Sequence, residues 1–522
     1  MSEPVFSGDP LQWLARVLAQ DPDRSFLETA AGQRYSRREF DALISKYAAA
    51  LAQRGVVPTD RVAAQVEKSP EAVALYLACL KLGAVFVPLN TAYTLAELEY
   101  FLQDAQPRMA VVRPQDLANV RTIADRVGVP DVQTLGAQGD GSLPRLAAST
   151  TQAPPDSFTA EPAALAALLY TSGTTGRSKG AMLTRDNLGS NAATLAQAWH
   201  FSEADVLLHA LPIFHVHGLF VAINTVLASG ATMLFLPKFD ADEVLRLLPR
   251  ATVLMGVPTF YTRLLQHPGL TREATRNIRL FVSGSAPLLA DTHREFRERT
   301  GHAILERYGM SETLMNTSNP YEGERVPGSV GPPLSGVEVR ITDPESGRPL
   351  TAPDAIGMIE VRGPNVFAGY WRLPEKTATE FRSDGFFITG DLGRIDARGY
   401  VHIVGRGKDL VITGGYNVYP IEIEAEIDAL PGVVESAVIG VAHPDFGEGV
   451  TAVVVKRENA ELDETTIRQA LEQRLAKFKL PKRVLFVDEL PRNTMGKVQK
   501  SVLREAYRQL YGASDGLPPT RK

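Results

Sequence analysis

One segment of the sequence, residues 170–180 (Tyr-Thr-Ser-Gly-Thr-Thr-Gly-Arg-Ser-Lys-Gly), concentrates groups that bind phosphate. It contains five Ser or Thr hydroxyls, three glycines and two cations. Glycines expose backbone N–H groups to an oligophosphate, hydroxyls donate hydrogen bonds, and cations offset negative charge. An apolar run precedes the segment and a stretch with helical pattern follows it. Its spacing, Gly-x-x-Gly-x-x-Lys, is not that of a Walker A loop, and its composition alone is also compatible with a polar surface loop.

The composition indicates a packed chain of at least two domains. The 522 residues exceed the size of one ordinary hydrophobic core. A formal charge of −5 gives no overall positive field for nucleic acid or an anionic membrane, so an anionic substrate must meet local cations. The single cysteine, Cys79, excludes an internal disulfide and lies in an apolar run, where a buried inert thiol is expected. No signal-peptide pattern or long apolar span occurs, so we expect a cytoplasmic protein.

The order of the predicted elements indicates the α/β class. From about residue 35 to 345, helical segments alternate with short apolar strands such as residues 252–258 and 280–283, which is typical of a mostly parallel, helix-covered sheet. Ligands bind beyond the carboxyl ends of such strands. Short strands with Gly, Pro and Asp turns predict a β-rich subdomain over about 336–405. We expect an N-terminal domain over 1–405 and a small α+β domain over 406–522, with strands near 435–441, 450–456 and 484–487 and a helix over about 464–476.

Eight short motifs resemble those of the adenylate-forming acyl-CoA synthetases, and the resemblance covers roughly residues 25–505. Each motif is a weak signal alone, whereas eight in the family's order exclude a chance match. The motifs lie at residues 170–180, 211–215, 283–286, 307–313, 369–370, 389–391, 405–409 and 491–497. The resemblance implies that a carboxylate attacks the α-phosphate of ATP to give an acyl-AMP and pyrophosphate, and that coenzyme A then displaces AMP.

The resemblance also implies a role for individual residues around ATP. Glu312, helped by Thr171, would bind Mg²⁺, for which a carboxylate is a suitable hard ligand. Tyr308 would stack on adenine, Asp391 would accept from the ribose hydroxyls, and Arg406 would contact the nucleotide. Without the family, Glu312 could be a helix-capping partner, Asp391 a turn residue and Tyr308 part of the core. The implied triphosphate ligands are Thr171, Ser172, Gly173, Thr174, Thr175, Gly176 and Lys179, and Gly309, Met310 and Ser311 join Tyr308 at the nucleotide.

The C-terminal part would supply a mobile lysine. Lys497 matches the residue that bridges the substrate carboxylate and the α-phosphate, where it reduces repulsion between two anions. The segment 405–409 is glycine-flanked, and Lys408 in it matches the family's hinge, about which the C-terminal domain rotates between the two half-reactions. After rotation, Gly414 and Gly415 would line the path of coenzyme A, and Lys477, from a local basic cluster, would bind its phosphates.

A short dicarboxylic acid would need a cation for its second charge, because an unpaired buried carboxylate is very unfavourable. At this finer level the sequence is similar to malonyl-CoA synthetases, which implies malonate as substrate, with methylmalonate tolerated. We expect Arg263 to bind the distal carboxylate with help from Ser283 or Ser285, and His215 to lie near the reacting end. Considered alone, Arg263 would be a surface arginine and His215 a core histidine.

Three alternatives stay open. A sister enzyme for acetate, propionate or 3-hydroxypropionate would share every ATP motif. An adenylating enzyme that loads a carrier-protein thiol is a second alternative, although no carrier domain is evident. A non-catalytic nucleotide-binding relative is disfavoured by the presence of Lys497, Glu312 and Asp391. The sequence predicts small-molecule partners only and leaves monomer and homodimer open.

Overall fold

The computed structural model describes residues 10–151, 161–171, 178–414, 416–458, 460–493 and 496–511. The chain forms two compact units. Unit 1 comprises residues up to 285 together with 293–339 and 361–388, and unit 2 comprises 286–292, 340–360 and 389 onwards. The predicted α/β class is confirmed. The predicted domain boundary at residue 405 stays a prediction. Residues 340–360 and 389–405, which precede it, belong to the same compact unit as the C-terminal residues.

An eight-stranded sheet forms one half of unit 1. Its central strands, β13 to β1, are parallel, and the edge strands β14 and β2 pair antiparallel. The apolar run at 280–283 forms a buried strand with the predicted bounds. In sheet order the strands are β14 Leu314–Ser318, β13 Leu305–Met310, β12 Leu280–Ser283, β11 Val253–Gly256, β9 Val206–His209, β10 Thr232–Phe235, β1 Ser25–Thr29 and β2 Arg34–Ser36.

A six-stranded sheet forms the other half of unit 1. Five strands are parallel, and the last, β8, returns antiparallel along β7. Leu168 and Tyr170 of β7 belong to the apolar cluster that this sheet and its helices bury. In sheet order the strands are β6 Asp131–Thr134, β5 Met109–Val112, β3 Arg61–Gln65, β4 Val85–Pro88, β7 Leu165–Thr171 and β8 Lys179–Thr184.

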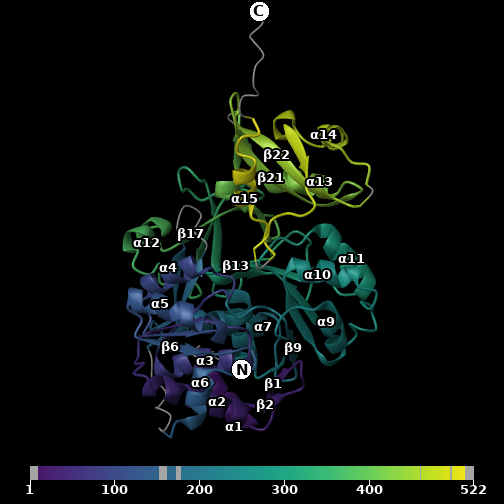
Figure 1. Ribbon diagram of the computed structural model, residues 1–522. Helices are drawn as coiled ribbons and strands as arrows, with labels where there is room; N and C mark the ends of the chain where they lie inside the picture. The colour runs from purple at the N-terminus through teal and green to yellow at the C-terminus, as the bar shows by residue number, and fades with distance from the viewer. Residues whose placement is uncertain are drawn as a thin grey trace, which may run out of the picture. The chain divides into compact units, whose positions relative to one another are not determined.

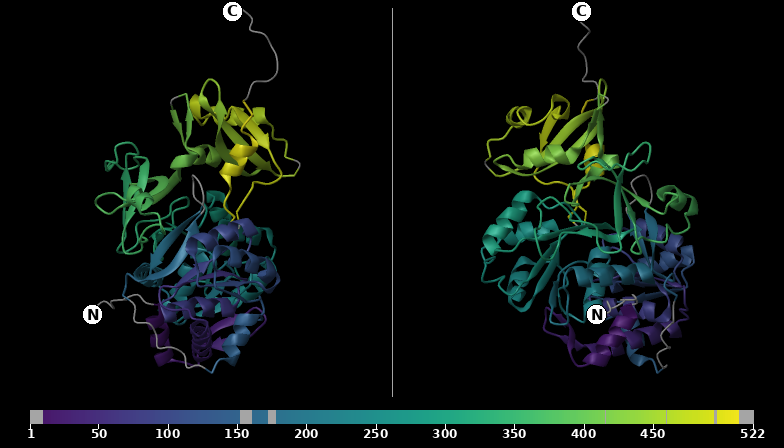
Figure 2. Two further views of the ribbon diagram at one scale, coloured as in Figure 1. Left: turned by 60° about the vertical axis from the view of Figure 1, so that its left-hand side comes forward. Right: turned by 180° about the vertical axis from the view of Figure 1, so that it is seen from behind.

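Helices pack over the strands of unit 1, as the purple, blue and teal ribbons of Figures 1 and 2 show. Helices α9 and α10 lie side by side in these views. A π-helix, η2 His217–Ile223, leads into α8. The α-helices are α1 Pro10–Gln20, α2 Arg37–Gln53, α3 Pro70–Leu82, α4 Leu95–Ala105, α5 Leu117–Val127, α6 Ser142–Ser149, α7 Arg185–Ala198, α8 Asn224–Ser229, α9 Ala241–Leu247, α10 Pro258–Gln266, α11 Ala290–Thr300 and α12 Pro374–Glu380, with 3₁₀ turns η1 Pro114–Asp116 and η3 Leu248–Arg250.

Helix α3 is the buried helix that contains the single cysteine. The Ser69 hydroxyl accepts from the Ala72 N–H at its start, and Gly83 ends it in the left-handed conformation. Every residue of α3 except Glu71 and Lys81 is buried. The expectation of a buried Cys79 is confirmed, and burial raises the pKa of its thiol, so the thiol stays protonated and unreactive.

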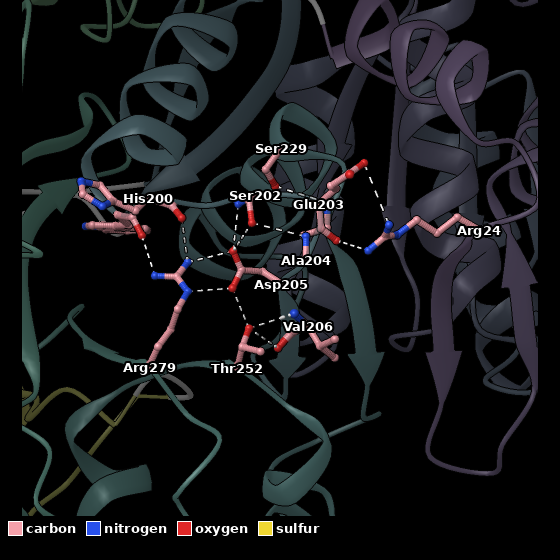
Figure 3. Close-up of polar contacts among 12 residues, drawn as sticks. Arg24, His200, Ser202, Glu203, Ala204, Asp205, Val206, Ser229, Thr252 and Arg279 are labelled. Carbon is pink, nitrogen blue, oxygen red and sulfur yellow. Dashed lines mark hydrogen bonds and ion pairs between the residues drawn. The ribbon is translucent and has the colours of Figure 1, made fainter.

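A hydrogen-bonded ion pair joins the starts of three neighbouring strands (Figure 3). Asp205, Thr252 and Arg279 directly precede β9, β11 and β12. Arg279 donates to both carboxylate oxygens of Asp205 at 2.7 and 2.9 Å, and Thr252 donates to the same carboxylate at 2.7 Å. Burial opposes ionisation of Asp205, but the bonds from Arg279 and Thr252 outweigh it and lower its pKa. The pair therefore fixes the ends of the strands opposite to those where ligands are expected.

Replacing Asp205 by alanine should destabilise unit 1 by about 3–5 kcal/mol, because the change leaves the largely buried Arg279 without its counter-charge. All three tryptophans, Trp13, Trp199 and Trp371, lie in unit 1. Urea unfolding followed by their fluorescence therefore reports this unit. Asp242→Ala is the matched control, because Asp242 pairs with His267 at the surface and such pairs contribute at most about 1 kcal/mol. Equal shifts for the two variants would contradict the prediction.

Unit 2 contains two sheets, with its apolar core around the second of them. The four-stranded sheet has the order β15 Glu338–Thr342, β16 Gly357–Arg362, β17 Phe387–Ile395 and β18 Val401–Arg406. The five-stranded sheet comprises β20 Tyr416–Val418, β19 Val411–Thr413, β22 Gly447–Lys456, β21 Val433–His443 and β23 Arg483–Phe486. The helices are α13 Pro420–Asp428, α14 Glu464–Glu472 and α15 Lys500–Ala506, with 3₁₀ turns η4 Gly407–Asp409 and η5 Lys477–Lys479.

Candidate active site

The segment predicted to bind phosphate lies between two strands of a hairpin. Thr171 ends β7 directly opposite Lys179, the first residue of β8. A helix follows the segment as predicted, α7 from Arg185, but the strand β8 at residues 179–184, which was not predicted, comes before it. Strand β8 is paired on both edges, to β7 and, through bonds of 2.9 and 2.8 Å, to residues 369–371. The predicted ligands Ser172, Gly173, Thr174, Thr175 and Gly176 lie outside the described residues.

Lys179 lies beside Tyr370, which belongs to one of the eight motifs, and beside Glu380, both in unit 1. Its Nζ is 4.7 Å from the centre of the Tyr370 ring and 3.9 Å from Glu380 Oε1. The Tyr370 hydroxyl donates to Glu312 Oε1 at 3.1 Å. Burial and the charges of Glu312 and Glu380 raise the pKa of Tyr370, so the phenol keeps the proton that it donates. The structure thus places Lys179, predicted to bind phosphate, and the buried Glu312, predicted to bind a metal ion, on either side of Tyr370.

The residues around Glu312 are suited to Mg²⁺, which also takes phosphate and water ligands, and not to a metal ion that is bound by protein side chains alone. No group of three or more His, Cys, Asp or Glu side chains in the described part of the chain could hold a metal ion. Mg²⁺ is commonly bound through one or two carboxylates, with phosphate oxygens and waters completing the octahedron. Glu312 is buried, and Thr171 is half-buried at the end of β7. These residues would hold the ion only together with the triphosphate.

The predicted adenine-binding residues lie on β13 and the turn that follows it. Tyr308 is buried, and the register of β13 and β14 shifts between Tyr308 and Gly309. A Cβ at Gly309 would lie 1.8 Å from the Leu314 carbonyl oxygen, so only glycine allows the two strands to approach this closely. Met310 ends the strand, and Ser311 is half-buried directly before Glu312.

In unit 2 the structure brings Asp391, Arg406, Lys408 and Lys497 together. Asp391 and Arg406 face each other across β17 and β18, with Arg406 Nε 3.3 Å from Asp391 Oδ1. Burial and the charge of Arg406 lower the pKa of Lys497 to about 8, and the same two causes lower the pKa of Lys408. Lys497 therefore stays mostly cationic at pH 7, as the predicted bridging role requires. That role and the hinge role of Lys408 stay predictions.

The predicted coenzyme A residues form a separate part of unit 2. Gly414 has φ 58°, and its N–H donates to the Phe446 carbonyl at 2.8 Å. Two residues later, the Tyr416 ring stacks on Phe478 with centroids 4.6 Å apart. Lys477 is exposed at the start of η5, one residue before Phe478. Gly415 lies outside the described residues.

The predicted acid-binding residues lie at or after the carboxyl ends of β9, β11 and β12 in the eight-stranded sheet. Ser283 ends β12 and is buried, and its Oγ has no hydrogen-bond partner among the described residues. Ser285 has φ 72°, a strained value for a residue with a side chain. His215 is half-buried, and burial lowers its pKa to about 4, so it is neutral at pH 7. Arg263 is exposed on α10, which is held to β12 by a 2.6 Å bond from Tyr261 to the Val282 carbonyl.

Two buried residues next to Gly284 and Ser285 had no role predicted from the sequence. His217 is fully buried at the start of η2, and the Ser285 hydroxyl lies 3.3 Å from its Nδ1. Arg307 is buried on β13 next to Gly284. The signal in the sequence was a pair of charged residues, Glu306 and Arg307, inside a strand. The π-helix at His217, a feature frequent at functional sites, is visible only in the structure.

Comparisons with known proteins agree with this arrangement. Residues 14–371 match the model of the AMP-binding enzyme family, and residues 422–497 match the model of the AMP-binding enzyme C-terminal domain. The chain belongs to the AMP-binding enzyme family. Within it, the crystal structure of ATP-bound MatB from Rhodopseudomonas palustris is 61% identical, with a TM-score of 0.94 and coverage of 96% of this chain and 100% of that chain.

Curated members of the family are also similar over most of the chain. The mitochondrial malonate–CoA ligase ACSF3 of Mus musculus is 38% identical over 84% of this chain and 79% of its own length. A malonate–CoA ligase of Arabidopsis thaliana is 36% identical over 85% of this chain and 78% of its own length. The predicted cytoplasmic location stays a prediction. Among the described residues, no helix combines the length and the apolarity needed to cross a bilayer.

Proposed function

We infer that this chain is an AMP-forming malonate–CoA ligase. The observation that supports this most strongly is the 61% identity, over 96% of the chain, to ATP-bound MatB. The Lys179, Tyr370 and Glu312 group supports it from the geometry, because an ATP-dependent enzyme needs a cation and a metal-binding carboxylate at the phosphates. Two malonate–CoA ligases among the relatives support malonate as the acid.

The reaction proceeds in two displacements. A carboxylate oxygen of malonate attacks the α-phosphorus of ATP, the bond between the α-phosphorus and the bridging oxygen breaks, and pyrophosphate leaves. The sulfur of coenzyme A then attacks the acyl carbon of malonyl-AMP and AMP leaves. Glu312 and Thr171 would hold Mg²⁺ together with the phosphates, and the ion would supply positive charge to the triphosphate.

The residues of this chain position the two anions and reduce their repulsion. Lys179 neutralises phosphate charge, Asp391 and Arg406 hold the nucleoside, and Lys497 bridges the attacking carboxylate and the α-phosphate. Neutral His215 lies near the reacting carboxylate without adding charge. Gly414, Gly415 and Lys477 receive coenzyme A in the second displacement.

A substrate panel tests this function. The purified chain is given ATP, Mg²⁺ and coenzyme A with acetate, propionate, 3-hydroxypropionate, malonate, methylmalonate or succinate, and AMP and thioester are measured. We expect AMP and malonyl-CoA in equal amounts, with malonate preferred. Preference for acetate would contradict the malonate assignment. AMP without thioester would instead favour transfer to a carrier-protein thiol.

Truncating Arg263 to alanine should reduce kcat/KM for malonate by the equivalent of about 2–5 kcal/mol, because a charge pair to the distal carboxylate is lost. The KM for ATP should stay nearly unchanged, because Arg263 is assigned to the acid alone. The control is Arg246→Ala, an exposed arginine on neighbouring helix α9 that pairs with Glu243. Wild-type malonate kinetics in Arg263→Ala would assign the distal carboxylate to other residues.

A further inference from the structure

Helix α4 carries two polar side chains one turn apart, and neither had a predicted role. Tyr100 and Asp104 are four residues apart, so they lie on the same face of the helix. A capping box between Thr94 and Glu97 fixes the start of α4, and its buried apolar residues pack in the apolar cluster of the six-stranded sheet. Both polar side chains therefore project from a helix whose own position is fixed.

Asp104 holds the strand that ends in Thr171. The hydroxyl of Tyr170, the preceding residue, donates to Asp104 Oδ2 at 2.5 Å. Burial, and then the bond to this carboxylate, raise the pKa of Tyr170, so the phenol keeps its proton and is the donor. The Tyr170 ring also packs against Phe101 of α4, with ring centroids 4.6 Å apart. The end of β7 is thus tied to α4 by one hydrogen bond and one ring contact.

Tyr100 holds the start of the returning strand. Its hydroxyl donates to the Ser178 carbonyl at 2.7 Å, and Ser178 directly precedes Lys179, the first residue of β8. Thr171 and Lys179 face each other across the hairpin, and they are the predicted triphosphate ligands that the structure describes. Two hydrogen bonds to one helix therefore fix the neighbours of both ligands.

The last turn of α4 also holds the segment on the other edge of β8. The Asp104 carbonyl is one of the last four of the helix, which lack partners within it. This carbonyl accepts from Trp371 Nε1 at 3.1 Å and from Arg372 Nη1 at 3.3 Å. The Trp371 backbone N–H in turn donates to the Gly180 carbonyl of β8 at 2.8 Å. The same helix thus contacts β7, the residue before β8 and the segment 369–371.

We propose that Tyr100 and Asp104 are positioning residues for the triphosphate of ATP. They act through Thr171 and Lys179, which they hold in place before ATP arrives, so that binding does not have to order these groups first. The proposal rests on the proposed ATP-dependent ligase function. The effect is confined to the first displacement, because malonyl-AMP no longer carries the β- and γ-phosphates.

The first test is Tyr100→Phe, which removes one hydroxyl and keeps the ring. Ser178 is half-buried, so water can replace the lost donor and the fold should survive. We expect KM for ATP to rise about three- to tenfold, the scale of one net hydrogen bond, with KM for malonate within about twofold of wild type. Conversion of preformed malonyl-AMP and coenzyme A to thioester should be unchanged. The control is Tyr35→Phe, which removes a phenol hydroxyl that donates to Glu71 Oε1 from the edge strand β2 and should change none of these values.

A pair of variants tests Asp104. Asp104→Ala leaves the buried Tyr170 hydroxyl without its acceptor and should raise KM for ATP about tenfold or more, whereas Asp104→Asn keeps an acceptor oxygen and should restore KM to within about twofold of wild type. A role in the fold alone would lower the active fraction and reduce both half-reactions equally. Such an equal reduction, or wild-type KM for ATP in both Tyr100→Phe and Asp104→Ala, would overturn the proposal.

This proposal and the proposed function fail in different ways. A wild-type chain that forms no AMP from ATP with any acid of the panel would overturn the function. A wild-type chain that forms malonyl-CoA, together with variants whose KM for ATP is unchanged, would overturn only the positioning role. If the wild type prefers another acid, KM for ATP is measured with that acid and the same outcomes decide.

Discussion

Replacing Lys497 by alanine is expected to slow formation of malonyl-AMP by on the order of 10³-fold, the scale of losing one charged group that stabilises a transition state. The positive charge of Lys497 would reduce the repulsion between the malonate carboxylate and the α-phosphate of ATP as they approach each other. Its neighbours Asp391 and Arg406 are the predicted nucleoside ligands, so the amine is held where the nucleotide would be bound. ATP–pyrophosphate exchange in the presence of malonate measures this half-reaction alone.

The same variant should convert preformed malonyl-AMP and coenzyme A to thioester at a rate within about tenfold of wild type, because the second displacement no longer brings two anions together. The control is Lys456→Ala, an exposed lysine of the same unit that donates to a backbone carbonyl at 3.2 Å. Equal loss in both half-reactions would show that Lys497 is needed for the fold or for nucleotide binding, and would contradict the bridging role.

Replacing Glu312 by glutamine should reduce kcat/KM for ATP by about 10²–10³-fold. The amide keeps the size of the side chain and can still accept from the Tyr370 hydroxyl, but it lacks the charge that Mg²⁺ requires. When AMP formation is measured at increasing Mg²⁺ concentrations, Glu312→Gln should need a higher Mg²⁺ concentration than the wild type to reach half of its maximal rate.

The matched control for Glu312 is Glu380→Gln. Glu380 is the other carboxylate beside Lys179, and Lys376 also pairs with it at 2.6 Å, so it has a partner without a metal ion. We expect an effect of about tenfold, the lower end of the scale of an outer-shell change. A larger loss in Glu380→Gln than in Glu312→Gln would move the metal-binding role to Glu380.

Local patterns in the sequence predicted much of the fold. The apolar run 280–283 became β12 with its predicted bounds, and the strands of the C-terminal part were located to within a few residues. The helix predicted to run to 476 ends at Glu472, although its apolar spacing continues. Leu475, in the bend that follows, and Phe478, in the 3₁₀ turn η5, still pack on the same core. Periodicity records which side chains are buried, and does not record whether the backbone between them stays helical.

The acid-binding residues were harder to predict because their environment is tertiary. A strand was missed after the phosphate segment because β8 is defined by its partners, β7 and residues 369–371, which the local sequence does not contain. Arg307 begins the motif at residues 307–313, but no role was predicted for it. The surroundings of Arg307 come from other parts of the chain: Gly284 follows the neighbouring strand, and the neutral His217 belongs to a third element.

The buried Cys79 makes this chain a convenient background for fluorescence labelling. Its thiol is inaccessible and protonated, and the sequence contains no second cysteine to remove. A cysteine introduced at the exposed Leu373 of unit 1 and another at the exposed Val434 of unit 2 would therefore be the only sites that react with a maleimide dye pair. Energy transfer between the two dyes, recorded during single turnovers, would time any rotation of one unit against the other relative to the release of pyrophosphate and of AMP.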